Sequence, residues 1–221
     1  MNRNIQYVDW GLIEYNQAWE RQELIFHNTI ERKLNGQTTD NMLIFCEHHH
    51  VYTLGKSGDE HNLLLNYIQL QAKDAQFVKT NRGGDITYHG PGQLVGYPIF
   101  DLENFGMGLK QYIYAMEECI IILLKKYNIN GDRMEGATGV WLDSKLKTAR
   151  KICAIGVRSS RFVTMHGFAL NINTDLSYFN HINPCGFIDK GVTSMEQETG
   201  RKIDLIKLKF ELNSIFIDLF K

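Results

Sequence analysis

The stretch NRGGDITYHGPGQLVGYPIF occupies residues 81–100 and holds five of the chain's 19 glycines and two of its three prolines. Glycine adopts backbone conformations closed to other residues and lets the chain approach a ligand closely. Side chains that donate or accept hydrogen bonds stand among these glycines: Arg82, Thr87, Tyr88, His89 and Gln93. Glycine content alone favours a hairpin turn. A turn does not need this polar set, so the segment is also a candidate ligand-binding loop.

The composition is that of an ordinary soluble globule. The chain has 221 residues with no linker, which predicts a single domain over residues 1–221. A net charge of −1 gives no overall basic field that would indicate nucleic acid or a membrane surface as partner. The four cysteines lack C-x-x-C spacing, and the N-terminus lacks an apolar signal region. These features predict a cytoplasmic protein with reduced thiols.

Helices and strands are predicted from hydrophobic periodicity. Helices are expected at 10–34, capped by Asp9 and with Leu12 and Leu34 in its apolar stripe, at 108–127 and at 203–220. Strands are expected at 42–46, 77–80, 94–100, 140–142, 152–157 and 162–172, with a further strand or loop at 51–55, a turn at 158–161 and a loop with a short helix at 60–75. Strict βαβ alternation is absent. The pattern therefore predicts an α+β fold, with a mixed or antiparallel sheet flanked by helices.

Two motifs that suggest a metal or a nucleotide are rejected. His48, His49 and His50 are adjacent, and neighbouring strand residues point to opposite faces, so the three cannot easily converge on one ion. Gly55-Lys56-Ser57 imitates the end of a phosphate-binding loop, but the glycine that such a loop needs falls on His50. We predict no metal and no cofactor.

Cys185 and Lys151 are the candidate catalytic residues. Cys185 lies between a proline and a glycine in a loop, whereas the other cysteines stand in apolar stretches that are typical of a core. Placement alone leaves Cys185 evenly balanced between a reactive and an inert thiol. Lys151 opens an apolar strand, where burial would favour its neutral, proton-accepting form. The alternative is that Lys151 only ends a basic turn.

Further positions suit close approach to a ligand. Gly156 and the segment 165–169 would bring backbone near a bound molecule. His166 lies in that segment, and its alternative interpretation is a hydrogen-bonded, partly buried histidine.

At this point the residues match a known family. Residues 82–98 closely resemble the signature of the lipoyl(octanoyl) transferases, also called lipoate-protein ligase B. The resemblance continues in order through residues 47–55, 136–141, 151–157, 163–171 and 183–186, so it covers most of the chain. His49-His50 stands where the family more often has prolines, and the turn 143–150 is longer and more basic than the family pattern.

The resemblance implies the fold of the biotinyl/lipoyl protein ligases and a transfer reaction without cofactor. An octanoyl group would move from acyl carrier protein to a lysine of lipoyl domains, in E2 subunits of 2-oxoacid dehydrogenases and in glycine cleavage H protein. This is the first step of endogenous lipoate biosynthesis. Cys185 would carry the acyl-thioester and Lys151 would assist the thiolate. The implied substrate-binding residues are Arg82, Gly83, Gly84, Asp85, Ile86, Thr87, Tyr88, His89, Ala154, Ile155, Gly156, Gly167, Phe168 and Ala169.

Carrier proteins of this pathway are acidic, as the resemblance implies. A local cationic docking surface is therefore predicted from Lys145, Lys147, Arg150, Arg158 and Arg161.

Two other functions remain open. An ATP-dependent lipoate ligase usually has a three-glycine run, whereas this chain has two glycines followed by Asp85. A non-catalytic acyl-binding module would need the glycine-rich loop but not Cys185 and Lys151.

Overall fold

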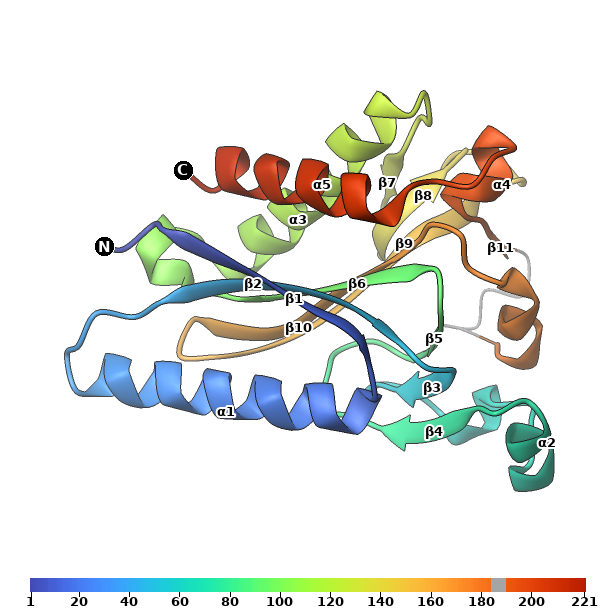
Figure 1. Cartoon of the computed structure of the whole chain (residues 1–221), viewed down its shortest axis with the longest axis horizontal. Helices are drawn as coiled ribbons and strands as arrows, with labels where there is room; N and C mark the ends of the chain where they lie inside the picture. The colour runs from blue at the N-terminus through green and yellow to red at the C-terminus, as the bar shows by residue number, and fades with distance from the viewer. Residues whose placement is uncertain (184–189) are drawn as a thin grey trace.

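The structure is a computed structural model that describes residues 1–183 and 190–221. Cys185 lies outside the described residues. A long twisted sheet runs through the molecule, with helices against both of its faces (Figure 1). The α+β class predicted from the sequence is confirmed.

The large sheet has the order β1-β2-β6-β10-β9-β8-β7, and β11 pairs with β9. β1 pairs with β2 and β11 with β9 in parallel, and the other neighbours are antiparallel, so the sheet is mixed. Its strands are β1 (Ile5–Ile13), β2 (Asn41–His48), β6 (Gln93–Ile99), β7 (Asp132–Met134), β8 (Ala137–Leu142), β9 (Arg150–Ser160), β10 (Val163–Asn171) and β11 (Gly191–Val192). Sequence periodicity missed β7 and β11, which are too short to show any.

Three helices cover the sheet. α1 (Tyr15–Leu34) lies along one face, while α3 (Leu109–Lys126) and α5 (Leu205–Leu219) lie along the other (Figure 1). Each face has its own apolar core: Phe26 of α1 packs on one side and Phe216 of α5 on the other, both fully buried. Burial of such aromatic side chains is a main source of stability. The described residues also form two short helices, α2 (Tyr67–Ala72) and α4 (Met195–Thr199).

A smaller sheet, β4-β3-β5, presents the glycine-rich segment. It consists of β3 (Val51–Leu54), β4 (Gln76–Lys79) and β5 (Ile86–His89). β5 was not predicted, because the glycine content on both sides of it suggested a continuous loop. Since β5 belongs to the small sheet and β6 to the large one, the segment bridges two sheets rather than closing one hairpin. Its residues 82–85 form a loop between β4 and β5; we call this the glycine loop.

The predicted N-terminal helix was wrong at its start. Residues 5–13 form β1, and α1 begins only at Tyr15. Asp9 does not cap the helix: its carboxylate accepts from the Gly11 N–H at 2.9 Å and pairs with Lys209 of α5. Gly11 has a φ of +61° at a register shift of β1, a conformation that suits glycine. Leu12, expected in the core, is 53% exposed.

The other boundary errors concern β9 and α1. The strand β9 runs to Ser160, so the turn predicted at 158–161 is confined to Arg161 and Phe162, which have φ values of 51° and 62°. Leu34, also expected in the core, is 61% exposed at the end of α1. Hydrophobic pattern alone does not distinguish a strand that continues through polar residues from a turn.

Two members of the predicted cationic surface lie far apart in the structure. Arg150 and Arg158 stand at opposite ends of β9, eight residues or about 26 Å apart. The Arg150 guanidinium donates to both oxygens of Glu198 at 2.7 Å, and Arg158 donates to Glu23 at 2.9 Å. Both arginines are therefore paired with carboxylates, and docking of the carrier on the basic residues stays a prediction.

Candidate functional site

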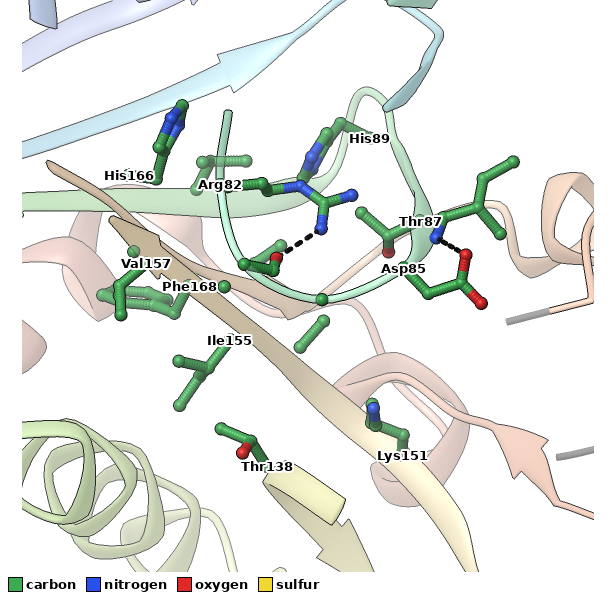
Figure 2. A pocket seen from close by; sticks show the side chains of 18 of the residues that line it. Arg82, Asp85, Thr87, His89, Thr138, Lys151, Ile155, Val157, His166 and Phe168 are labelled. Atoms are coloured by element: carbon green, nitrogen blue, oxygen red, sulfur yellow. Dashed lines mark hydrogen bonds between the residues drawn. The ribbon is translucent and has the colours of Figure 1, made fainter. Parts of the chain in front are cut away.

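A cavity of about 600 Å³ lies between the glycine loop, β9 and the start of β8. In Figure 2, Arg82, Asp85 and Thr87 lie on one side of this space, and Ile155, Val157 and Lys151 follow β9 along the other. The predicted site residues that line it are Arg82, Gly83, Gly84, Asp85, Ile86, Thr87, His89, Lys151, Ala154, Ile155, Gly156, Gly167, Phe168 and Ala169. The fold thus gathers residues from β5, β9, β10 and the glycine loop at one place.

Tyr88 is the predicted substrate-binding residue that packs elsewhere. Its ring stacks on Tyr178 at 4.8 Å, and its hydroxyl bonds His50 Nδ1 at 2.7 Å. Tyr88 is fully buried in the apolar cluster under the small sheet. Its neighbours Thr87 and His89 line the cavity, because successive strand side chains point to opposite faces. A direct contact of Tyr88 with substrate stays a prediction.

The glycine loop is held on both sides by backbone contacts. The N–H groups of Gly55 and Lys56 donate to Asp85 O and Arg82 O, at 3.2 and 2.9 Å. On the other side, the Gly83 N–H donates to Val157 O of β9 at 3.0 Å. A side chain at Gly55 would collide with the Gly84 carbonyl. The glycines therefore allow the loop to lie directly on the end of β3 and on β9.

We expect Gly156→Ala to disturb this contact. The added Cβ would lie 2.8 Å from Gly83 O, a backbone atom that must move with the glycine loop. The affinity for octanoate, measured by calorimetry, should fall roughly tenfold, equivalent to about 1.4 kcal/mol. Gly108→Ala is the matched control, because its Cβ meets only Gln111 Oε1 at 3.8 Å. Equal octanoate affinity in the two variants would contradict a tight fit of the loop on β9.

A buried chain of hydrogen bonds runs beneath the cavity. Arg82 donates to Thr53 O at 2.6 Å and to Thr53 Oγ1 at 2.9 Å. Next along the chain, His89 Nδ1 donates to Gln93 Oε1 at 2.8 Å. The Gln93 amide donates to Asn171 Oδ1 at 2.9 Å. These groups are buried and mutually bonded, so they fix the loop and β5 against β10. Gln93 was noted in the sequence, but Thr53 and Asn171 carry no local signal.

Three buried histidines near the cavity are neutral. Burial, together with His48 and Arg82, holds the pKa of His89 well below its ordinary value. Burial lowers the pKa of His48 to about 4, and burial with the Arg82 charge lowers that of His166 to about 3. His166 donates from Nε2 to Asn81 Oδ1 at 2.6 Å. The interpretation of His166 as a buried, hydrogen-bonded histidine therefore holds for Nε2. The ring also lines the cavity.

These histidines predict acid sensitivity. In the unfolded chain, histidine side chains take up protons near pH 6.5. In the folded chain, the pKa values of His48 and His166 are lowered to about 4 and about 3. Stability should therefore be full above about pH 6.5 and should fall below it, by about 1.4 kcal/mol per pH unit for each histidine. Urea unfolding of wild type and His48→Gln at about pH 7 and 5 tests this. The variant should lose less stability than wild type, and equal losses would contradict the assignment.

Lys151 lies in the wall of the cavity and is partly buried. It is the second residue of β9, paired with Trp141 of β8 on one side and with Val192 of β11 on the other. Its amine lies 4.6 Å from the centroid of the Trp141 ring, a cation–π contact. The prediction that Lys151 is partly buried is confirmed. Residues 143–149 do form a turn, but Lys151 belongs to β9 and lines the cavity.

Sequence reasoning missed two neighbours of Lys151. Trp141 was seen only as part of an apolar strand, and Lys190 was not singled out. Lys190 lines the same cavity, with its amine 5.5 Å from the Trp141 ring centroid. Both contacts depend on the register of β8 and β11 against β9, which has no local sequence signal.

In the sequence, Asn183 and Lys190 flank the segment 184–189, which contains Cys185. On one side, the Asn183 N–H donates to Asn62 O at 2.9 Å, and the Asn62 amide donates to Asp85 of the glycine loop at 2.9 Å. On the other side stands Lys190, over Trp141. Asn183 is therefore linked through Asn62 to the glycine loop, and Lys190 lines the cavity itself.

The three described cysteines are unsuited to nucleophilic attack. They are fully buried free thiols: Cys46, Cys119 and Cys153. Burial raises the pKa of each, which disfavours the thiolate. Their assignment to the core is confirmed, and Cys185 remains the candidate nucleophile.

Across 1–183 and 190–221, no group of three or more His, Cys, Asp and Glu side chains could hold a metal ion. Nor does any helix within these ranges have the length and apolar character needed to span a membrane.

The cavity lies in a chain that matches a known family of catalytic domains. The family described as "Lipoyl protein ligase A/B catalytic domain" matches residues 14–216, and the chain belongs to this family. Within it, a protein named octanoyltransferase from Bacteroides fragilis (strain YCH46) is 57% identical over 205 residues, covering 93% of each chain. Another from Parabacteroides distasonis is 56% identical and covers 98% of this chain and 99% of its own. The chain is therefore an acyltransferase of the octanoyltransferase type.

A solved structure supports the fold. A chain from the archaeal lipoylation system of Thermoplasma acidophilum, described as a bi-partite lipoate protein ligase and its E2 lipoyl domain, superposes with a TM-score of 0.71. The match covers 97% of this chain and 82% of that one, at 14% identity. The expected lipoyl protein ligase fold is confirmed.

Proposed function

We propose that residues 1–221 form one catalytic domain that moves an octanoyl group from octanoyl-acyl carrier protein to a lysine of lipoyl domains. The expected acceptors are E2 subunits of 2-oxoacid dehydrogenases and glycine cleavage H protein. The main support is that the Lys151 amine stands in the wall of the cavity that the glycine loop covers. The free thiols of the described cysteines suit a reducing, cytoplasmic setting.

In the first half-reaction, Lys151 in its neutral form takes the proton of the Cys185 thiol. The sulfur attacks the thioester carbonyl of the carrier, so a new C–S bond forms on Cys185. The C–S bond to the carrier breaks, and the carrier thiolate takes the proton from Lys151. The octanoyl chain then occupies the cavity, against apolar side chains such as Ile155 and Phe168.

In the second half-reaction, the amine of the acceptor lysine attacks the acyl-Cys185 carbonyl. A C–N bond forms, the C–S bond breaks, and Cys185 leaves as a thiolate. Lys151 accepts the proton that the amine loses and returns it to the thiolate. No bond is made to a nucleotide, so the reaction consumes no ATP.

The test of this function is transfer without ATP. The chain is incubated with octanoyl-carrier and an apo lipoyl domain in the presence of a chelator, and the lipoyl domain is weighed by mass spectrometry. We expect the octanoyl mass on the lipoyl domain. Transfer that requires ATP and free octanoate would indicate a ligase instead, and binding of octanoate without any transfer would indicate a binding module.

A further inference from the structure

Two lysine amines share one indole ring in the cavity wall. The amine of Lys151 lies 4.6 Å from the Trp141 ring centroid, and that of Lys190 lies 5.5 Å from the same point. Adding these distances limits the separation of the two nitrogens to about 10 Å, one Debye length at 0.1 M salt. Trp141 is 2% exposed, so this pair is partly shielded from solvent.

Backbone and side-chain contacts position both lysines. Lys151 sits between β8 and β11, and its carbonyl accepts from the Thr193 N–H at 3.0 Å. The Lys190 amine contacts Met134 Sδ of β7 at 2.8 Å. The Gly191 N–H, one residue further on, donates to Ala149 O at 3.1 Å. The contact of its amine with Met134 and the backbone bond of Gly191 therefore hold Lys190 in position.

Other ionisable groups near Lys151 on the packed elements of the described chain are Arg150, Cys153, Asp85, Glu117 and Glu198. Arg150 and Glu198 bind one another. Burial raises the pKa of Cys153, so its thiol is neutral. Glu117 accepts from Arg133 and from the Gly139 N–H, and Asp85 accepts from Asn62. Lys190 differs from this set because its amine shares the indole ring with Lys151.

We propose that Lys190 is a positioning residue that biases Lys151 towards its neutral, proton-accepting form. The assignment rests on the proposed transfer function. A second ammonium in the same partly buried site disfavours a charged Lys151. The Trp141 ring attracts both cations, but it carries no negative charge to neutralise them. Lys190 acts through Lys151, without a bond to the reacting atoms.

The charge of Lys190 should change the pH dependence of Cys185 acylation. Acylation of Cys185 needs neutral Lys151, so its rate rises with pH as Lys151 loses its proton. Removing the Lys190 charge makes protonated Lys151 more favourable and moves this rise to higher pH. At a separation of up to about 10 Å we expect a shift of roughly one pH unit, or about tenfold in rate on the rising limb.

The test is the single-turnover rate of Cys185 acylation from octanoyl-carrier between about pH 6 and 11, a range that spans the ordinary titrations of a thiol and an amine. Lys190→Met and Lys190→Gln remove the charge, Lys190→Arg retains it, and Lys202→Met removes an exposed charge elsewhere. We expect the rising limb of the pH–rate profile to move to higher pH in both neutral variants. It should stay near its wild-type position in Lys190→Arg and Lys202→Met. Using two neutral variants protects the test against one that does not fold.

Two results would overturn the role of Lys190 and leave the transfer function standing. If the neutral variants are slower at every pH with the limb unmoved, Lys190 is only structural. If Lys190→Arg moves the limb as far as Lys190→Met does, charge is not the cause. Absence of acylation in wild type at any pH would overturn the transfer function itself, and this assignment with it.

Discussion

Cys185→Ser is expected to abolish the acyl-enzyme and to reduce octanoyl transfer by at least about a thousandfold. A serine hydroxyl does not ionise in the range where a thiol does, and no described cysteine offers a substitute. The thiols of Cys46, Cys119 and Cys153 are fully buried, and burial raises the pKa of each.

The matched control is Cys119→Ala, which removes a buried thiol of α3 that does not line the cavity. Once circular dichroism has verified its folding, this variant should be acylated at the wild-type rate. Transfer by Cys185→Ser at a rate near that of wild type would remove the thioester from the mechanism.

Lys151→Arg is expected to slow Cys185 acylation at pH 7 by about a hundredfold or more. A guanidinium keeps the positive charge and can still stack on Trp141, but it does not give up a proton in proteins. The variant should therefore still bind octanoate, because the apolar residues that line the cavity are unchanged, while proton transfer from the thiol is lost. The measurements are single-turnover acylation and octanoate calorimetry on the same preparation.

Lys147→Arg is the control for this change. Lys147 is exposed in the same basic turn, so the same chemical substitution is made away from the cavity. Its acylation rate should equal that of wild type. If Lys151→Arg is acylated as fast as Lys147→Arg at pH 7, Lys151 is an electrostatic neighbour of the thiol and not its base.

The parts of the fold that follow from local pattern were predicted well. The stripe of α3 identifies a helix, and the apolar residues around Ile152 identify β9, because one buried face or a buried strand leaves its period in the sequence. β1 was misread as helix. Its apolar residues also fit a helical stripe, and only pairing with β2 decides between the two.

The candidate site also has a part that the sequence predicted and a part that it did not. The lining residues of the glycine loop and β9 were predicted through a long contiguous motif, and the fold brings them together. The contacts of Lys151 with Trp141 and its nearness to Lys190 were not predicted. They arise from the pairing of β8 and β11 with β9, and non-local register of this kind leaves no mark in a single sequence.

The most direct test of the central claim is the mass of the chain itself after incubation with octanoyl-carrier, without ATP and without acceptor. The account predicts one octanoyl group on Cys185, released by hydroxylamine as a thioester should be, and lost when an apo lipoyl domain is added. An unmodified Cys185 in a preparation that still octanoylates the lipoyl domain would contradict it.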